Sequence, residues 1–365
     1  MLVRWIAALV AFVAVILIGV VTVGNFGAGI DPNAGFDLVG TDSFALIGAI
    51  ALVIAFLVYA AIEYAQTGGF ASIARQFDTR TIVLMPIAIA INVILGATVA
   101  NALKIPVYLD SIGTILVGAL AGPVAGAFTG FLTNILWTYV LPPPFQNGPA
   151  AAFALVAAVI GVLAGFAGRA GWLRPRPNRS GTELLIGGLV ALAVVVGLAV
   201  YAYTRFYGST FNFFNPDVEV EPLFVVLGWL VGLIFVGFVV GFGYLLIARR
   251  DLGVAYVVVA GMVTGVIAAL ISAPISANVF SGVTGGGTDF LVAAFRQAGS
   301  DLQTATFQQG LLSDPVDKLV TFFVVYLVLN AMARRTKARF PQGEQLLEAG
   351  DTGATEEGEW RSATT

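Results

Sequence analysis

The sequence predicts an all-α integral membrane protein with about ten transmembrane helices. Of its 365 residues, 58% are hydrophobic and only 11% are charged. The mean hydropathy is +0.93, and apolar runs near the length that crosses a ~30 Å hydrocarbon core recur along the chain. A soluble domain of this size does not need so much apolar surface, so the lipid bilayer is an expected partner.

The expected spans follow from these apolar runs. They cover residues 5–24, 43–65, 81–103, 109–121, 123–141, 150–168, 183–204, 222–247, 253–275 and 316–334. The first run is longer than the ~7–15-residue core of a cleavable signal peptide, and no small-residue cleavage site follows it, so we expect a retained span. The run 109–121 is too short to cross alone at ~1.5 Å per residue, so it must be tilted, extended or shielded by neighbours.

The basic residues predict the orientation. With an internal N-terminus, 14 of the 18 Lys and Arg residues fall on the cytoplasmic side; the exceptions are Lys104, Arg205, Arg296 and Lys318. Because basic residues favour the cytoplasmic side, we expect a multi-pass protein of the plasma (cytoplasmic) membrane with both termini in the cytoplasm. Omitting one span would move every later basic cluster to the other side.

The connecting segments differ in character. Residues 26–42 are rich in Gly and Asp and predict a plain loop, whereas 142–149 (PPPFQNGP) predicts a stiff turn set by prolines. Residues 205–221 carry acidic residues among aromatic ones. The longest outer segment, 276–314, contains apolar residues that favour a lid packed on the protein. The acidic segment 336–365 predicts a disordered cytoplasmic tail.

The composition argues against catalysis. The chain has no Cys and no His, which removes thiolate nucleophiles, imidazole bases and the usual ligands of transition metals. It has no GxxxxGK[ST] motif, so ATP-driven work needs a partner subunit. We therefore expect no enzyme activity, no metal site, no cofactor in this chain and no nucleic-acid partner.

Residues 108–137 predict a hairpin of two apolar helices hinged at Gly122-Pro123. After the hinge, Gly126 and Gly130 continue a four-residue repeat. On a helix this period leaves a groove without side chains, into which another helix can press its backbone.

Polar residues stand at both ends of this hairpin. Asp110 and Ser111 begin it, and Thr133, Asn134 and Trp137 lie near its end. Because a hairpin returns to the side that it left, both clusters are expected at the same membrane face. Polar groups inside a membrane are costly and indicate a site. The alternatives are an N-cap carboxylate for Asp110 and a hydrogen bond between helices for Asn134.

A third polar cluster is expected at the start of the last span. The motif SDPVDK resembles a helix cap with Pro315 in the first turn. It would place Lys318 in that turn, where the helix dipole disfavours a cation. We therefore expect Lys318 to pair with Asp314, Asp317 or Asp110.

The third span carries a stripe of small residues at four-residue spacing, Ala88, Asn92, Gly96 and Ala100. Such a stripe suits either the docking of a partner helix or packing inside this protein.

Three stretches resemble substrate-binding (S) components of energy-coupling factor (ECF) transporters. They read IPVYLDSIGTILVGALAGPVAGAFTGFLTNILW, SAPISANVFSGVTGGGTDF and SDPVDKLVTFFVVYLVLNAM. The LDSIGT…GP…G…TN run is the most specific part. The resemblance implies a six-helix core that binds a vitamin-like micronutrient at the outer face. It also implies a T component and two ATPase subunits as partners.

The resemblance also divides the chain. It implies two extra helices in 1–66, four core helices in 80–170, an inserted hairpin in 181–250, two core helices in 253–335 and the tail 336–365. It places substrate contacts on outer helix ends and loops, at Asp110, Ser111, Asn134, Trp137, Asn278, Thr284, Asp289, Asp317 and Lys318. It places the contact with the T component on the stripe Ala88, Asn92, Gly96 and Ala100.

The expected function is therefore substrate binding in an ATP-driven micronutrient importer. One alternative is a membrane sensor, although the tail shows no output domain. Another is a self-sufficient secondary transporter, which needs a buried carboxylate at mid-membrane. In the predicted topology the acidic residues lie at span ends instead.

Overall fold

The computed structural model describes residues 2–23, 38–103, 107–143, 145–207, 237, 239–297 and 299–348. These residues form helices and no strand. Within these described ranges, five helices are long and apolar enough to cross a membrane: Leu2–Val23, Gly40–Thr67, Thr79–Ala100, Gly148–Arg169 and Gly253–Phe280. The all-α membrane class is thus confirmed, and the count of ten spans stays a prediction.

The elements are as follows. The first half contains α1 (Leu2–Val23), α2 (Leu38–Thr67), α3 (Ala71–Gln76), α4 (Thr79–Gly96), the π-helical turn η1 (Ala97–Ala102), α5 (Ile112–Ala121), α6 (Pro123–Tyr139), the 3-10 turn η2 (Gly148–Phe153) and α7 (Ala154–Arg169). The second half contains α8 (Gly181–Tyr207), the π-helical turn η3 (Tyr244–Ala248), α10 (Gly253–Phe280), α11 (Asp289–Gln297), α12 (Leu302–Ala331), α13 (Arg334–Ala338) and the 3-10 turn η4 (Gly343–Leu346).

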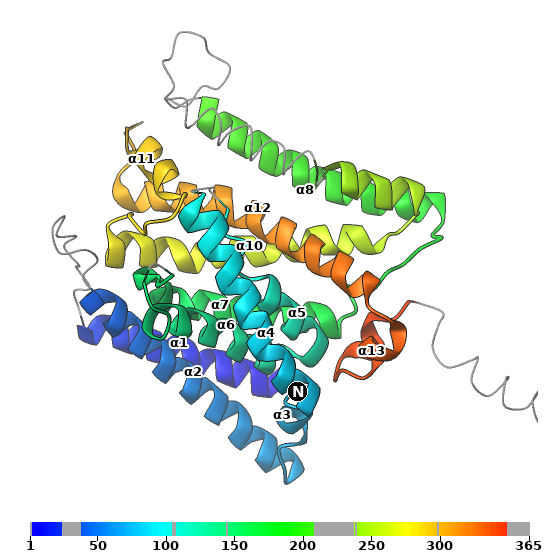
Figure 1. Cartoon of the computed structure of the whole chain (residues 1–365), viewed down its shortest axis with the longest axis horizontal. Coiled ribbons are helices and arrows are strands. Elements are labelled where there is room, and N and C mark those ends of the chain that lie inside the picture. Colours follow the sequence, from blue (N-terminus) through cyan, green and yellow to red (C-terminus); the bar gives the residue numbers. More distant parts are fainter. Residues whose placement is uncertain are drawn as a thin grey trace, which may run out of the picture.

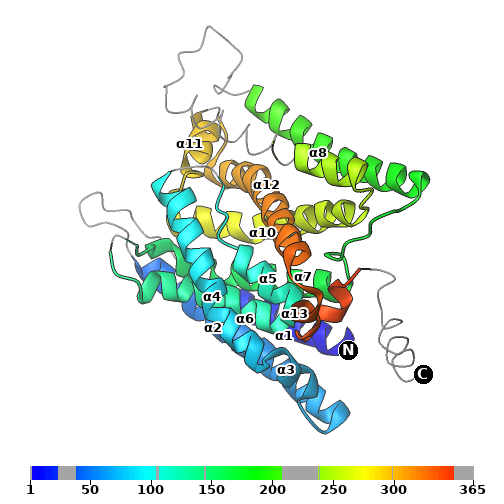
Figure 2. The same cartoon turned by 45° about the vertical axis from the view of Figure 1, so that its right-hand side comes forward.

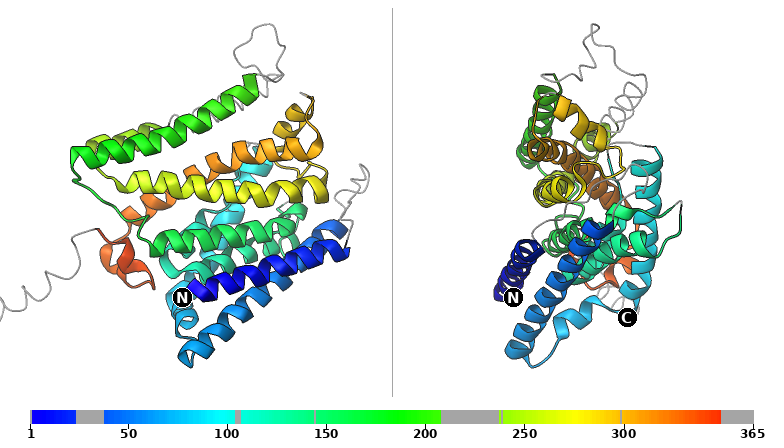
Figure 3. Two further views of the ribbon diagram at one scale, coloured as in Figure 1. Left: turned by 180° about the vertical axis from the view of Figure 1, so that it is seen from behind. Right: turned by 90° about the vertical axis from the view of Figure 1, so that its left-hand side faces the viewer.

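The helices of the segments 1–66 and 181–250 lie at two opposite edges of the bundle. The pair α1–α2 packs on η2 and α7, while α8 packs on α10 and α12 at the opposite edge (Figure 1; Figure 3). Between these edges α4 crosses over α5 and α6 (Figure 2). The segments 1–66 and 181–250 therefore contribute helices that flank the others.

The α5–α6 hairpin forms as its sequence predicts. Its turn is made by Gly122, whose φ of 131° suits glycine. A Cβ on Gly126 would stand 2.5 Å from the carbonyl oxygen of Gly161, and one on Gly130 would stand 2.3 Å from that of Ala157. The glycine groove therefore receives the backbone of α7. Nearly all of the ten-residue α5 is buried, so this short helix is shielded by its neighbours.

The start of α12 differs from the prediction. The helix begins at Leu302, where Asp301 caps it by accepting hydrogen bonds from the Thr304 amide (3.1 Å) and hydroxyl (2.6 Å). These bonds hold the pKa of Asp301 below its usual value. Pro315 lies inside the helix, because α12 packs along α10 and Gly265 of α10 leaves room for the proline backbone.

The outer segment 276–314 is correspondingly not a long loop. Residues 276–280 end α10, α11 occupies 289–297, and α12 contains 302–314. The short stretch 281–288 remains as a candidate lid.

The two ends of the α5–α6 hairpin turn are capped by glutamines. Gln76 accepts a hydrogen bond from the Val124 amide (2.8 Å), at the start of α6. Gln342 donates to the carbonyl oxygens of Gly118 (3.1 Å) and Ala119 (3.2 Å), near the end of α5. These bonds satisfy backbone groups that helix ends leave without partners.

Gln342 belongs to the segment 336–365, which the sequence predicted to be a disordered tail. That prediction is wrong for the first part of the segment. Residues 334–338 and 343–346 form α13 and η4, and Leu346 is fully buried. Residues 349–365 lie outside the described residues, as do most of the expected segments 26–42 and 205–221 and the first part of the span 222–247. We call the end of the bundle that carries Arg4, Gln76, Arg169 and Gln342 the basic end.

Candidate functional site

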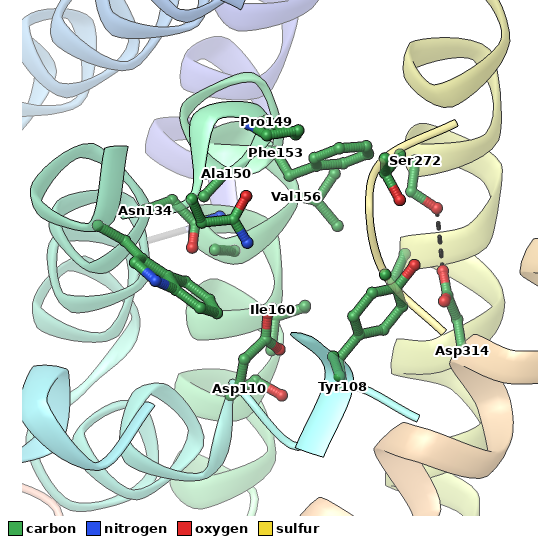
Figure 4. Close-up of a pocket in the computed structure, with 18 of the residues that line it drawn as sticks. Tyr108, Asp110, Asn134, Pro149, Ala150, Phe153, Val156, Ile160, Ser272 and Asp314 are labelled. Carbon is green, nitrogen blue, oxygen red and sulfur yellow. Dashed lines mark hydrogen bonds between the residues drawn. The ribbon is translucent and has the colours of Figure 1, made fainter. Parts of the chain in front are cut away.

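A cavity of about 100 Å³ lies among α6, α7, α10 and α12, away from the basic end (Figure 4). On this measure one water needs roughly 10–15 Å³, so the cavity has room for several waters or a small molecule. Its polar lining comes from Tyr108, Asp110, Ser111, Asn134, Asn147, Ser272, Thr284, Asp314 and Lys318. Its apolar lining includes Trp137, Phe153, Val156, Ile160 and Ala268.

Two segments that are distant in sequence cover the cavity. Tyr108 and Thr288 share a hydrogen bond between their hydroxyl groups (2.7 Å), and the amide of Gly287 donates to the carbonyl of Ala100 (3.2 Å). Asp289 accepts hydrogen bonds from the amide (2.9 Å) and hydroxyl (2.8 Å) of Thr284. The stretch 281–288 is therefore fastened over the cavity at three points.

The charged side of the cavity is built around Lys318. Its ammonium contacts the Asp317 carboxylate and donates to the Ser111 hydroxyl (2.9 Å). Asp110 lies 4.0 Å away. Asp317 is fully buried, and its other oxygen accepts the amide of Leu109 (2.7 Å). Leu109 has a φ of 52°, which a non-glycine residue adopts only when its surroundings hold it there.

The predicted pairing of Lys318 with carboxylates is present, but its predicted position in a first turn is wrong. Lys318 precedes the end of α12 at Ala331 by 13 residues, or roughly 20 Å along the helix. Asp314 is likewise no cap. It accepts a hydrogen bond from Ser272 of α10 (2.9 Å) and lines the cavity. Desolvation of the Lys318 cation, and not the helix dipole, is therefore what its carboxylate partners offset.

Asn134 faces the cavity from α6 and is only 6% exposed. Its side-chain amide has no hydrogen-bond partner among the described residues. Because this amide reaches the cavity and bonds to no described side chain or backbone group, it is available to a ligand there. Beside it, Trp137 donates its indole N–H to the carbonyl of Phe145 (2.9 Å) and presents the ring as a wall. Across the cavity Phe153 stacks on Phe280, with ring centres 5.7 Å apart.

The predicted substrate residues fall into two groups. Six of them line the cavity: Asp110, Ser111, Asn134, Trp137, Thr284 and Lys318. The other three lie outside its lining. Asn278 is exposed and donates to the carbonyl of Pro274 (2.8 Å). Asp289 holds the stretch 281–288 through Thr284, and Asp317 holds Lys318 and Leu109. Asp110 does not act as an N-cap, since Ser111 occupies that position of α5.

The stripe of small residues, which runs from α4 into η1, is buried inside this chain. Ala88 and Asn92 are 0% exposed. The Asn92 amide donates to Thr114 (2.8 Å), and its oxygen accepts the amide of Gly113 (2.7 Å). A Cβ on Gly96 would stand 2.4 Å from the ring of Trp137. Ala88, Asn92, Gly96 and Ala100 thus face α5, α6 and the cavity, so an outside helix has no access to them in this structure.

Several lining residues were missed by sequence reasoning. Asp314 was interpreted as a cap, although it lies three and four residues before Asp317 and Lys318. On a continuous helix this spacing places it on their side. Ser272, a hydroxyl in an apolar span, was the other available signal. Asn147 lies in the proline-rich turn 142–149 and Phe153 follows it, and neither carries a pattern of its own.

The cavity offers selective binding of a small polar molecule. Two carboxylates, an ammonium and amide groups can fix orientation, while aromatic rings provide apolar contact. No group of three His, Cys, Asp or Glu residues suited to a metal ion occurs in the described part of the chain.

Comparisons with protein-family models, with curated proteins and with solved structures found no match to this chain.

Proposed function

We propose that this protein is the substrate-binding membrane subunit of an ATP-driven importer of a small, vitamin-like molecule. The observation that carries the proposal is the unpartnered amide of Asn134, which faces a cavity covered by a fastened segment. A ligand that completes the hydrogen bonds of this amide gains affinity and a fixed orientation in the cavity. The sequence resemblance to ECF S components supports the choice of ATP-coupled partners.

The geometry of the cavity suits capture from the outer side. It lies roughly 16–20 Å along α6 and α12 from their ends at the basic end. With that end in the cytoplasm, the cavity lies in the outer part of the membrane. A ligand then enters beneath the stretch 281–288, and its later delivery requires the partner subunits.

A secondary transporter is the second candidate, and one observation favours it. Asp314 and Asp317 are buried within α12, away from both ends of this helix. Buried carboxylates inside a membrane are typical of ion-coupled transport. The hydrogen bond of Asp314 with Ser272 and the ion pair of Asp317 with Lys318 also suit a site that binds its substrate without coupling to an ion.

Uptake measurements separate these candidates. In cells that express the protein, transport of the molecule that co-purifies with it should stop when ATP is depleted. It should continue when a protonophore collapses the proton gradient while ATP is maintained. The opposite pattern would contradict the importer proposal and favour the secondary transporter.

A matched pair of asparagine variants tests the binding site. Asn134→Ala should lose the co-purifying molecule, whereas Asn278→Ala, on the exposed side of α10, should retain it. Losing hydrogen bonds from one amide should weaken affinity by roughly 1–3 kcal/mol, or about 5-fold to 150-fold. Equal retention by both variants would show that the cavity is not the binding site.

A further inference from the structure

The cavity beneath the stretch 281–288 carries more negative than positive charge. Among the residues that the structure describes, its charged lining consists of Asp110, Asp314 and Lys318. The Lys318 ammonium is in contact with the carboxylate of Asp317, which lies outside the lining. Asp317 therefore neutralises Lys318, and the charges of two carboxylates remain for the cavity itself.

Neither of these two carboxylates is neutralised by a close cation. Asp110 lies 4.0 Å from the Lys318 ammonium, which is beyond hydrogen-bond distance. Asp314 accepts hydrogen bonds from the hydroxyl groups of Ser272 (2.9 Å) and Ser313 (3.3 Å), which carry no charge. No Lys or Arg nitrogen of the described residues lies within 4.0 Å of it. Both carboxylates can therefore attract a positively charged ligand.

Aromatic side chains lie next to these carboxylates. Tyr108, Trp137 and Phe153 line the same cavity, and Figure 4 shows Tyr108 between Asp110 and Asp314. The face of an aromatic ring attracts a cation, and protein sites for organic ammonium groups combine such rings with negative charge. The lining therefore favours an organic cation.

The amide of Asn134 independently points to a ligand with N–H groups. It is only 6% exposed, lines the cavity and has no hydrogen-bond partner among the described residues. Its oxygen can accept a hydrogen bond from a protonated amine. Lys318 uses two of its three N–H groups for Asp317 and Ser111, so the third can donate to an acceptor atom elsewhere on the same ligand.

We propose that the ligand of this cavity is a small organic molecule with a protonated amine, which binds where Asp110 and Asp314 flank Tyr108. This inference rests on the proposed role of the cavity as a substrate site and names the class of that substrate. The attraction between the amine and the carboxylates is stronger here than in water, because the cavity is largely enclosed by protein. The apolar part of the ligand then packs against Trp137 and Phe153.

Thermal unfolding of the purified full chain, in a neutral detergent at neutral pH, tests the proposal. The probe is benzylammonium chloride. It is compared with benzyl alcohol, which has nearly the same shape without the charge, and with sodium benzoate, which has the opposite charge. Sodium chloride keeps the ionic strength equal. Benzylammonium should raise the unfolding temperature with a saturable concentration dependence, and the other two compounds should not.

Carboxylate variants place the probe in the cavity. Asp314→Asn and Asp110→Asn should each weaken the apparent affinity for benzylammonium roughly 10-fold or more, because a hydrogen bond between charged groups is lost. Asp110→Asn keeps the test valid if Asp314→Asn does not fold, since the Asp110 side chain is 25% exposed. Glu183→Gln is the matched control, because Glu183 is an exposed carboxylate outside the lining. It should keep the wild-type response.

The amine class and the importer proposal can fail separately. No saturable response to benzylammonium, an equal response to benzyl alcohol, or unchanged affinity in both carboxylate variants would overturn the amine class. ATP-dependent uptake of a co-purifying molecule that has no protonated amine would also overturn it, and the importer would stand. Uptake that does not depend on ATP, together with selective binding of benzylammonium, would contradict the importer and support the amine class.

Discussion

The pair formed by Lys318 and Asp317 should contribute strongly to stability as well as to the binding cavity. In Lys318→Met the carboxylate of Asp317, which is fully buried, would keep only the amide of Leu109 as a partner. Removing one member of a buried ion pair costs about 3–5 kcal/mol. At roughly 2 °C per kcal/mol for a large chain, the unfolding temperature should fall by roughly 6–10 °C.

A second substitution should separate the two effects. Adding Asp317→Asn to Lys318→Met removes the unpaired charge, and the asparagine oxygen can still accept the Leu109 amide. Most of the lost stability should return, since neutral replacements of buried ion pairs are often tolerated. Adding Asp110→Asn instead should restore little, because the side chain of Asp110 is 25% exposed and reaches water.

The assay is thermal unfolding in one detergent, together with retention of the co-purifying molecule. Neither double variant should regain binding, because both lack the Lys318 ammonium in the cavity. An unfolding temperature for Lys318→Met within about 2 °C of wild type would refute the buried-pair reasoning, given the roughly 6 °C minimum expected. Equal recovery by the two double variants would show that Asp317 is not the principal partner.

Three further outcomes are expected. Thr284→Cys should react with an impermeant thiol reagent on intact cells; reaction only after the membrane is opened would contradict the orientation. Gly96→Ala places a Cβ 2.4 Å from the ring of Trp137, so it should reduce the stability of the fold by about 1–3 kcal/mol and weaken binding and uptake together. Loss of uptake with unchanged binding would instead support a docking role for α4. Gly126→Ala places a Cβ 2.5 Å from a backbone carbonyl oxygen of α7, so it should lower the unfolding temperature by an amount equivalent to about 3 kcal/mol or more. Gly197→Ala, with nothing within 4 Å of the added Cβ, should be neutral. Equal effects of the two substitutions would refute close packing of α6 on α7.

The features that sequence alone determined are local ones. Apolar runs determined the helical membrane class, because a helix satisfies its backbone groups within its own segment. The Gly122 turn and the four-residue glycine repeat determined the hairpin and its groove. Since a hairpin returns to its starting side, the sequence also placed Asp110 and Asn134 at the same end of the hairpin, where both line the cavity.

The features that only tertiary structure decided depend on contacts between distant segments. The SDPVDK motif carries the local signals of a helix start, yet packing against α10 carries α12 through Pro315 from a cap at Asp301. The stripe on α4 suits a partner helix and an internal neighbour equally well, and the structure fills that place with α5 and α6. The cavity likewise depends on side chains far apart in sequence, such as Ser272 with Asp314. Sequence periodicity specifies which face of a helix is apolar, but not which helix covers it.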